Sequence, residues 1–283
     1  MFNSVIKRAL KEDIGERDIT SSLLIPPGLK GRAEIICQQE GVIAGLKVAE
    51  EVFRSVDAHT RLKALKREGE RCKEQEKVGE VEGRLRNILC AERVALNFLS
   101  RLSGIATLTA RFVEETKGFP VKIMDTRKTT PNLRELEKYA VKVGGGVNHR
   151  FRLDEMILIK DNHIKVLRQR SPHISLKEIL EKTKRKAEKG LQVEIEVSTL
   201  KEFKEAMEGK PDIIMLDNMS PEEIRKAVEW RNSQGLSVEL EVSGGITLEN
   251  VKEIARTGVE RISIGALTRG NAWLDFSLEV SHC

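Results

Sequence analysis

The sequence predicts an α/β barrel preceded by a separate, smaller α+β domain, on the evidence of two contrasting patterns. From Val121 onward, short β-branched apolar runs alternate with amphipathic helical stretches, as in a parallel sheet with crossover helices. Before Val121, short strands with glycine turns lead into one long helical stretch. The strand candidates after Val121 favour a barrel; they are 121–127, 156–163, 192–198, 212–218, 238–245 and 261–267.

Helix start signals fall between these strand candidates. A Ser or Thr that can accept a backbone N–H is followed three residues later by Glu, a pattern typical of a helix N-terminus. The pairs are Ser175 with Glu178, Thr199 with Glu202, and Ser220 with Glu223, the last with Pro221 at the first helical position. The spacing therefore predicts crossover helices that begin at these residues.

The region before Val121 has a different organisation. Residues 32–45 and 65–83 combine short strands with glycine turns, and a long helix is predicted over 92–117. We place the domain boundary inside that helix, near Ser103. The predicted domains are 1–103, joined by the C-terminal tail 268–283, and the barrel over 104–267.

Composition excludes several functional classes. Among 283 residues the net charge is only +5, without a long basic tract, so nothing favours a nucleic-acid partner. No apolar run approaches the roughly 18 residues of a membrane span, and the early charges of the N-terminal stretch predict that it is not a secretory leader. The cysteines form no CxxC pair and are predicted to be reduced thiols of a cytoplasmic protein: Cys37, Cys72, Cys90 and Cys283.

Polar and small residues collect where the predicted strands end. In α/β barrels the chemistry sits at this C-terminal mouth, so these positions are candidates for an active site. They are 125–128, 160–163, Glu194 and Glu196, 217–218, 241–245 and 265–266. Single members have structural alternatives: Asp161 or Asn162 could cap a loop, and Glu194 could be a buried ion-pair partner.

The last two strand ends are rich in small residues, which let backbone N–H groups approach an oxyanion closely. Ser243, Gly244 and Gly245 end one strand, and Gly265 and Ala266 end the next. A barrel usually binds phosphate after its final two strands, so we expect a phosphate here. The alternative is that the three-residue SGG segment is only a turn.

Glu196 and Asp217 end neighbouring strand candidates and offer hard oxygen ligands. Such ligands suit a Mg²⁺ ion that keeps several waters and bridges to a phosphate. The alternative is that the two carboxylates neutralise Lys160 or Lys128.

A cationic cluster is predicted at the same mouth. It comprises Arg127, Lys128, His149, Arg150 and Lys160, with the last histidine–arginine pair following a triple glycine at 144–146. Arginine binds carboxylate through two parallel hydrogen bonds, so this cluster could hold two carboxylates. The predicted ligand is a small, multiply anionic, phosphorylated molecule. The alternative is that His149 and Arg150 form a basic pair on the surface.

Long motifs in the chain resemble the quinolinate phosphoribosyltransferase family, the decarboxylating nicotinate-nucleotide pyrophosphorylases of NAD biosynthesis. The similarity extends from residue 12 to the final strand. The motifs are ERVALNFLSRLSGIAT (92–107), DTRKTTPNLRELEKYAVKVGGGVNHR (125–150), LIKDNH (158–163), IMLDN (214–218) and VSGGI (242–246).

The resemblance implies an incomplete (open) α/β barrel with an N-terminal α+β open-faced sandwich. It also implies a homodimer in which each sandwich covers the partner's barrel mouth. The implied reaction joins quinolinate to 5-phosphoribosyl 1-diphosphate with Mg²⁺ and yields nicotinate mononucleotide, diphosphate and CO₂.

The same resemblance assigns roles to individual residues. Quinolinate binding falls on Arg127, His149, Arg150 and Lys160, with Arg93 reaching in from the other subunit. Lys128, Glu196 and Asp217 face the diphosphate and its metal, for which Glu196 and Asp217 are the ligands. Substrate binding further includes Thr126, and the 5-phosphate falls on 243–245 and 265–266. Catalytic roles fall on Lys128, Lys160, Glu196 and Asp217.

Two other functions use the same residues. Lys160 could be the Schiff-base nucleophile of an aldolase-type barrel, which borohydride trapping would reveal. A relative of the family linked with molybdate transport could bind another oxyanion in the same pocket. The intact TRK, NHR and IKDNH motifs argue against that second alternative.

Overall fold

The computed structural model describes residues 3–270 and 273–282, and Cys283 and part of the predicted tail lie outside these ranges. Two compact units divide the chain. Unit 1 comprises 1–110, 129–145 and 267–283, and unit 2 comprises 111–128 and 146–266. The predicted domain bounds differ, because unit 1 also includes residues 129–145. In that segment the buried Glu137 accepts a 2.8 Å ion pair from Arg101, which holds the two stretches together.

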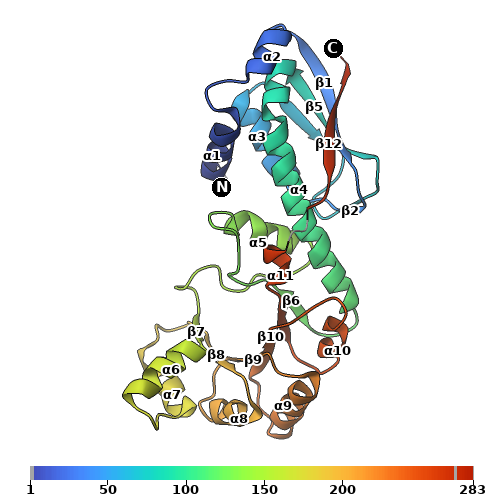
Figure 1. Cartoon of the computed structure of the whole chain (residues 1–283). Coiled ribbons are helices and arrows are strands. Elements are labelled where there is room, and N and C mark those ends of the chain that lie inside the picture. The colour runs from blue at the N-terminus through green and yellow to red at the C-terminus, as the bar shows by residue number, and fades with distance from the viewer. Residues whose placement is uncertain (1–2, 271–272, 283) are drawn as a thin grey trace. The chain divides into compact units, whose positions relative to one another are not determined.

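Unit 1 is built on an antiparallel sheet of four strands (Figure 1). Their order is β12 (Phe276–His282), β1 (Lys30–Cys37), β5 (Glu76–Arg84) and β3 (Arg61–Ala64), with a separate β2 (Gly41–Val42) and β4 (Arg71–Cys72) pair. The helices of this unit are α1 (Asn3–Ile14), α2 (Ile19–Leu24), α3 (Leu46–Val56), most of α4 (Leu85–Glu115), and α5 (Arg134–Val143). Helix α4 begins seven residues before its predicted start at 92, because the strand β5 runs directly into it.

Unit 2 contains a parallel sheet of six strands, and all six predicted strands are confirmed. The sheet order is β6 (Lys122–Met124), β11 (Arg261–Ser263), β10 (Glu239–Ser243), β9 (Ile213–Asp217), β8 (Val193–Val197) and β7 (Ile157–Ile159). The described strands β6 and β7 end this order without pairing to each other, so the expected open barrel is confirmed. The crossover helices are α6 (Asp161–Arg170), α7 (Leu176–Lys186), α8 (Leu200–Glu208), α9 (Pro221–Ser233) and α10 (Val251–Ala255), and α11 (Ala266–Arg269) follows β11 (Figure 1).

The predicted helix starts are confirmed at Ser175, Thr199 and Ser220. Each side-chain oxygen accepts the backbone N–H of the Glu three residues later, which satisfies one of the donors left free at a helix N-terminus. These caps fix where each helix begins after the preceding loop. No described helix combines the length and apolar character that a membrane span requires.

The strands of unit 2 carry apolar residues that are buried in the core of the unit. Ile195 of β8, Ile214 of β9 and Leu240 of β10 are fully buried. Burial of such side chains contributes roughly 1.5–3 kcal/mol each, so the strand bodies supply stability. The polar residues at the strand ends are thereby left for chemistry.

Candidate active site

Residues at the C-terminal ends of the unit 2 strands line a cavity of about 610 Å³. The structure brings together most of the predicted site, and the predicted binding and catalytic residues that line the cavity are Thr126, Arg127, Lys128, His149, Arg150, Lys160, Glu196, Asp217, Ser243, Gly244 and Gly245. Gly265 and Ala266 do not line it, although Gly265 lies close enough to Lys128 that an added Cβ would come within 3.1 Å of its Cδ.

One side of the cavity carries two guanidinium groups, from Arg127 and Arg150. The Arg150 Nη1 donates a 2.9 Å hydrogen bond to the carbonyl of Met156, which fixes the side chain. Burial lowers the pKa of Arg150, and the nearby charge of Arg127 lowers it further. Two like charges held this close favour an anion between them.

Another part of the cavity combines cations with carboxylates. Lys160 Nζ lies 2.6 Å from Glu196 Oε1, with side chains 44% and 14% exposed. The sequence left this pairing open as an alternative to metal binding, and the structure contains it. Asn218 donates a 2.8 Å hydrogen bond from Nδ2 to Asp217 Oδ2, which orients the second carboxylate.

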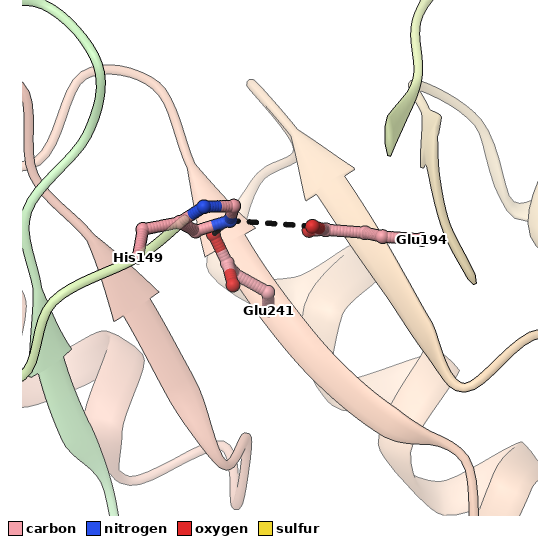
Figure 2. A group of neighbouring side chains, drawn as sticks. All are labelled: His149, Glu194 and Glu241. Carbon is pink, nitrogen blue, oxygen red and sulfur yellow. Dashed lines mark ion pairs between the residues drawn. The ribbon is translucent and has the colours of Figure 1, made fainter. Parts of the chain in front are cut away.

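His149 lies at the cavity wall, with two fully buried glutamates behind it (Figure 2). Its Nε2 is 3.2 Å from Glu194 Oε2 and 3.5 Å from Glu241 Oε1. Glu194 comes from β8 and Glu241 from β10, and neither lines the cavity. Glu194 is thus a buried partner of His149, close to the alternative expected for it, but the imidazole is neutral because its Nδ1 accepts a hydrogen bond.

Backbone groups set the orientation of this histidine. The His149 N–H donates to Asp125 Oδ1 at 2.9 Å, and the Arg150 N–H donates to His149 Nδ1 at 2.8 Å. Because Nδ1 is an acceptor, these contacts assign the ring proton to Nε2, facing the glutamates. Both ring nitrogens therefore face protein groups.

Burial changes the protonation of the two glutamates. It raises the pKa of Glu194 to about 7, against a weaker opposing effect of Arg261. It also raises the pKa of Glu241 to about 7, to which the charge of Glu194 contributes. At neutral pH, Glu194 and Glu241 together therefore carry less negative charge than two ionised carboxylates would.

The buried trio is also the one group of metal-ligating side chains found among the described residues. Magnesium in proteins usually keeps several waters. Because Glu194 and Glu241 do not line the cavity, the trio suits a buried network of polar side chains better than Mg²⁺. The predicted metal ligands Glu196 and Asp217 do line the cavity and are partly exposed.

The turn after β10 has a backbone that only glycine tolerates well. Gly244 and Gly245 have φ values of +94° and +61°, and a Cβ on Gly244 would overlap the side chain of Asn218. Asn218 itself has φ +54°, and its N–H donates to the Ser243 carbonyl at 2.9 Å. The two strand ends are thus joined, and the glycines leave room for an anion beside the backbone.

Arg93, the remaining predicted site residue, belongs to unit 1. It lies on α4 with a side chain 61% exposed and with Nη2 3.9 Å from Glu92 Oε1. This contact is long and exposed, so it leaves the guanidinium available for another group.

Sequence reasoning placed Asp125, Asn218 and Glu241 among the strand-end candidates but gave them no positioning role. Glu241 lies two positions before the cavity-lining Ser243, and strand periodicity puts both on the same face. That periodicity was a usable signal for Glu241. The hydrogen bonds of Asp125 and Asn218 depend on how the loops fold, so no local sequence pattern predicts them.

Comparison with known families and proteins agrees with this arrangement. Residues 18–103 match the family model of the quinolinate phosphoribosyl transferase N-terminal domain, and residues 105–279 match that of its C-terminal domain. The chain belongs to the quinolinate phosphoribosyltransferase family. The expectation from the sequence motifs is confirmed.

Relatives of this family resemble the chain along its whole length. A probable nicotinate-nucleotide pyrophosphorylase (carboxylating) of Methanocaldococcus jannaschii is 40% identical over 98% of this chain and 96% of its own. The Bacillus subtilis protein with the same description is 39% identical over 95% and 90%. The crystal structure of NadC from Streptococcus pyogenes has a TM-score of 0.92 at 37% identity, covering 100% of this chain and 97% of that one.

Proposed function

We propose that the protein transfers the 5-phosphoribosyl group of phosphoribosyl diphosphate to the ring nitrogen of quinolinate, in de novo NAD biosynthesis in the cytoplasm. The products are nicotinate mononucleotide, diphosphate and CO₂. The observation that carries this proposal is one cavity holding the Arg127–Arg150 pair, the carboxylates of Glu196 and Asp217, and the glycine turn at 244–245. Quinolinate phosphoribosyltransferase is the family to which the chain belongs.

The guanidinium side of the cavity suits the dicarboxylate. Arg127 and Arg150 offer paired donors to carboxylate oxygens, and a dianion would relieve the repulsion between them. Lys160 adds a cation at the neighbouring strand end. In this proposal these residues hold the pyridine nitrogen of quinolinate against the ribose C1, which supplies the proximity that the substitution needs.

The carboxylate side suits the diphosphate with Mg²⁺. Glu196 and Asp217 are hard oxygen donors in an open cavity, and Lys160 occupies only one oxygen of Glu196 in its closest contact. When bound, Mg²⁺ would neutralise charge on the departing diphosphate. Lys128 lines the same cavity, and its backbone N–H bonds Thr126 Oγ1 at 3.0 Å, which shapes this loop for the phosphate groups.

The loss of CO₂ follows from the first step. Once the ring nitrogen bonds to ribose it is cationic, and that charge stabilises the electron pair left on ring carbon 2 as the carboxylate departs. A proton then replaces CO₂ on this carbon. The cations that hold the substrate suffice for binding, and no separate decarboxylation cofactor is required.

The Lys160–Glu196 contact also bears on the aldolase alternative. A Schiff-base lysine attacks as a neutral amine, whereas this ammonium is ion-paired at 2.6 Å. Borohydride with a carbonyl substrate should therefore leave Lys160 unmodified.

Incubation with quinolinate, phosphoribosyl diphosphate and Mg²⁺ tests the proposed reaction. We expect nicotinate mononucleotide and CO₂ in equal amounts, detected by chromatography and by release of labelled CO₂. Nicotinate in place of quinolinate is the control and should give no product. Product from nicotinate alone would move the protein to a different transferase, and binding of molybdate without turnover would favour the transport-linked alternative.

The proposal includes a homodimer in which Arg93 completes the site of the partner subunit. Arg93→Ala and Glu196→Gln should each abolish activity, and mixed dimers should restore about a quarter of it, because half of the dimers have one intact site. Co-expression of the two variants measures this recovery. An active monomer, or mixed dimers without recovery, would contradict the shared site.

A further inference from the structure

Two cysteines of unit 1 have no part in the proposed reaction and lie against each other. Cys37 ends β1 and Cys72 ends β4, and both residues are fully buried. Their Sγ atoms are 2.8 Å apart. A disulfide has an S–S distance of about 2.05 Å, so bond formation needs an approach of less than about 1 Å.

The main chain holds this pair together. Cys37 lies opposite Glu76 in the β1–β5 ladder, and its carbonyl accepts the Gln75 N–H at 2.7 Å. Cys72 lies opposite Gly41 in the β2–β4 ladder. Because backbone pairing fixes the positions of Cys37 and Cys72, the two sulfurs stay close together whatever conformation the surrounding side chains adopt.

The two thiols differ in acidity, which gives them different roles in disulfide exchange. The contact between the two sulfurs lowers the pKa of Cys72, whereas the same contact together with burial raises the pKa of Cys37. Cys37 Sγ also lies 2.8 Å from the Gln39 carbonyl as a donor. Cys72 is therefore the thiol that more readily becomes a thiolate.

We propose that Cys37 and Cys72 are an oxidisable pair that closes an intrachain disulfide by exchange with a low-molecular-weight disulfide such as oxidised glutathione, while the chain folds and before strand pairing buries the two sulfurs. The Cys72 thiolate attacks one sulfur of that disulfide, forms a mixed disulfide and releases one thiolate. The Cys37 thiolate then attacks the Cys72 sulfur and releases the second. The pair loses two protons and two electrons, and the two electrons reduce the glutathione disulfide to two thiols. In the structure the pair is in its reduced state.

The disulfide would stabilise the segment that connects β1 to α3. Within this segment the Val42 N–H donates to Thr107 Oγ1 at 2.8 Å, and the Ala44 N–H donates to Ser103 Oγ at 3.0 Å, both on α4. The bond would close the loop between Cys37 and Cys72, and this constrains the unfolded chain. Oxidation should therefore raise the melting temperature by about 5–10 °C.

Thiol mapping tests the pairing directly. The full-length protein is refolded in a mixture of reduced and oxidised glutathione, alkylated in denaturant, digested and analysed by mass spectrometry. We expect a Cys37–Cys72 cross-linked peptide and alkylation of the other two of the four cysteines. The same treatment of the protein without prior unfolding gives a second measurement if refolding is poor. Alkylation of all four cysteines in both samples, or a cross-link between other cysteines, would overturn the proposal.

Melting curves with and without reductant test the consequence. The wild type and the matched control Cys90→Ala should lose about 5–10 °C when reductant is added. Cys37→Ala and Cys72→Ala should melt at the same temperature in both conditions. If the cross-link is established and the melting temperature of the wild type is the same with and without reductant, the stabilising role is refuted.

Discussion

Glu194 and Glu196 are the same residue type, two positions apart on β8 and on the same face, yet their surroundings differ. Glu196 lines the cavity and contacts Lys160 at 2.6 Å. Glu194 is fully buried behind His149, and burial raises its pKa to about 7. Two positions along β8 thus separate a carboxylate that faces the cavity from one whose pKa is raised by burial.

This contrast divides the site into two layers. The outer layer, with Glu196 and Asp217, is open to ligands and is where charge can be neutralised by a substrate or metal. The inner layer, Glu194 and Glu241 with His149, holds the cavity wall in place. Variants of the outer layer should therefore change turnover, and variants of the inner layer should change stability and its pH dependence.

The largest effect is expected for Glu196→Gln. Loss of this charge weakens the hold on diphosphate and Mg²⁺, so kcat should fall by about 1,000-fold with little change in melting temperature. Steady-state kinetics at saturating substrates, across a magnesium titration, measures this. Glu208→Gln, an exposed change on α8, is the matched control. Wild-type turnover in Glu196→Gln would remove this residue from the outer layer.

Arg150→Ala should separate the two substrates. Its guanidinium is proposed to hold a carboxylate of quinolinate, so KM for quinolinate should rise about 100-fold, while KM for phosphoribosyl diphosphate changes less than about threefold. Arg152→Ala, an exposed arginine two residues on, is the control. Equal losses for both substrates would contradict the assignment.

Gly244→Ala should have an intermediate effect. The added Cβ overlaps Asn218 and meets a φ of +94°, so the turn must shift. KM for phosphoribosyl diphosphate should rise by about tenfold, with a smaller change for quinolinate. Gly118→Ala also has a positive φ but open space around its Cβ, so it separates strain from displacement of the turn. Identical kinetics in both variants would argue against a phosphate at Gly244.

The smallest effect on turnover is expected for Glu241→Gln, which acts on the inner layer. Because burial raises the pKa of Glu241 from 4.5 to about 7, the folded state binds a proton that the unfolded state releases in this window. The free energy of unfolding therefore falls as the pH rises from 4.5 through 7. In the Glu241→Gln variant this fall should be smaller by about 2 kcal/mol. Unfolding by urea at pH 5 and pH 8 measures it, with Glu253→Gln as the exposed control. An unchanged pH dependence would show that Glu241 is not protonated in the folded protein.

Much of the fold and cavity was predictable because it depends on local signals. Strand periodicity and the caps at Ser175, Thr199 and Ser220 are encoded within a few residues. The cavity residues were found because they follow strands, as Asp217 follows the apolar run of β9.

The rest depends on contacts between distant segments. The partnership of His149 with Glu194 and Glu241 joins residues 45 and 92 positions apart, and the Cys37–Cys72 contact joins two separate ladders. No single-segment pattern specifies such pairings. Likewise, residues 129–145 cluster with unit 1 through the buried Glu137 and its partner Arg101, which sequence spacing alone does not reveal.

Strand β12 has a consequence for how the protein is made. It pairs with β1, so the first long strand of the chain has one neighbour, β5, soon after it and another at residues 276–282. During synthesis, one edge of β1 stays open until residues 276–282 have left the ribosome. An open edge can pair with the wrong strand. Most of unit 1 is synthesised before unit 2, but the unit is completed only when β12 pairs with β1. Removal of β12 should therefore destabilise unit 1, although β12 lies far from β1 in the sequence.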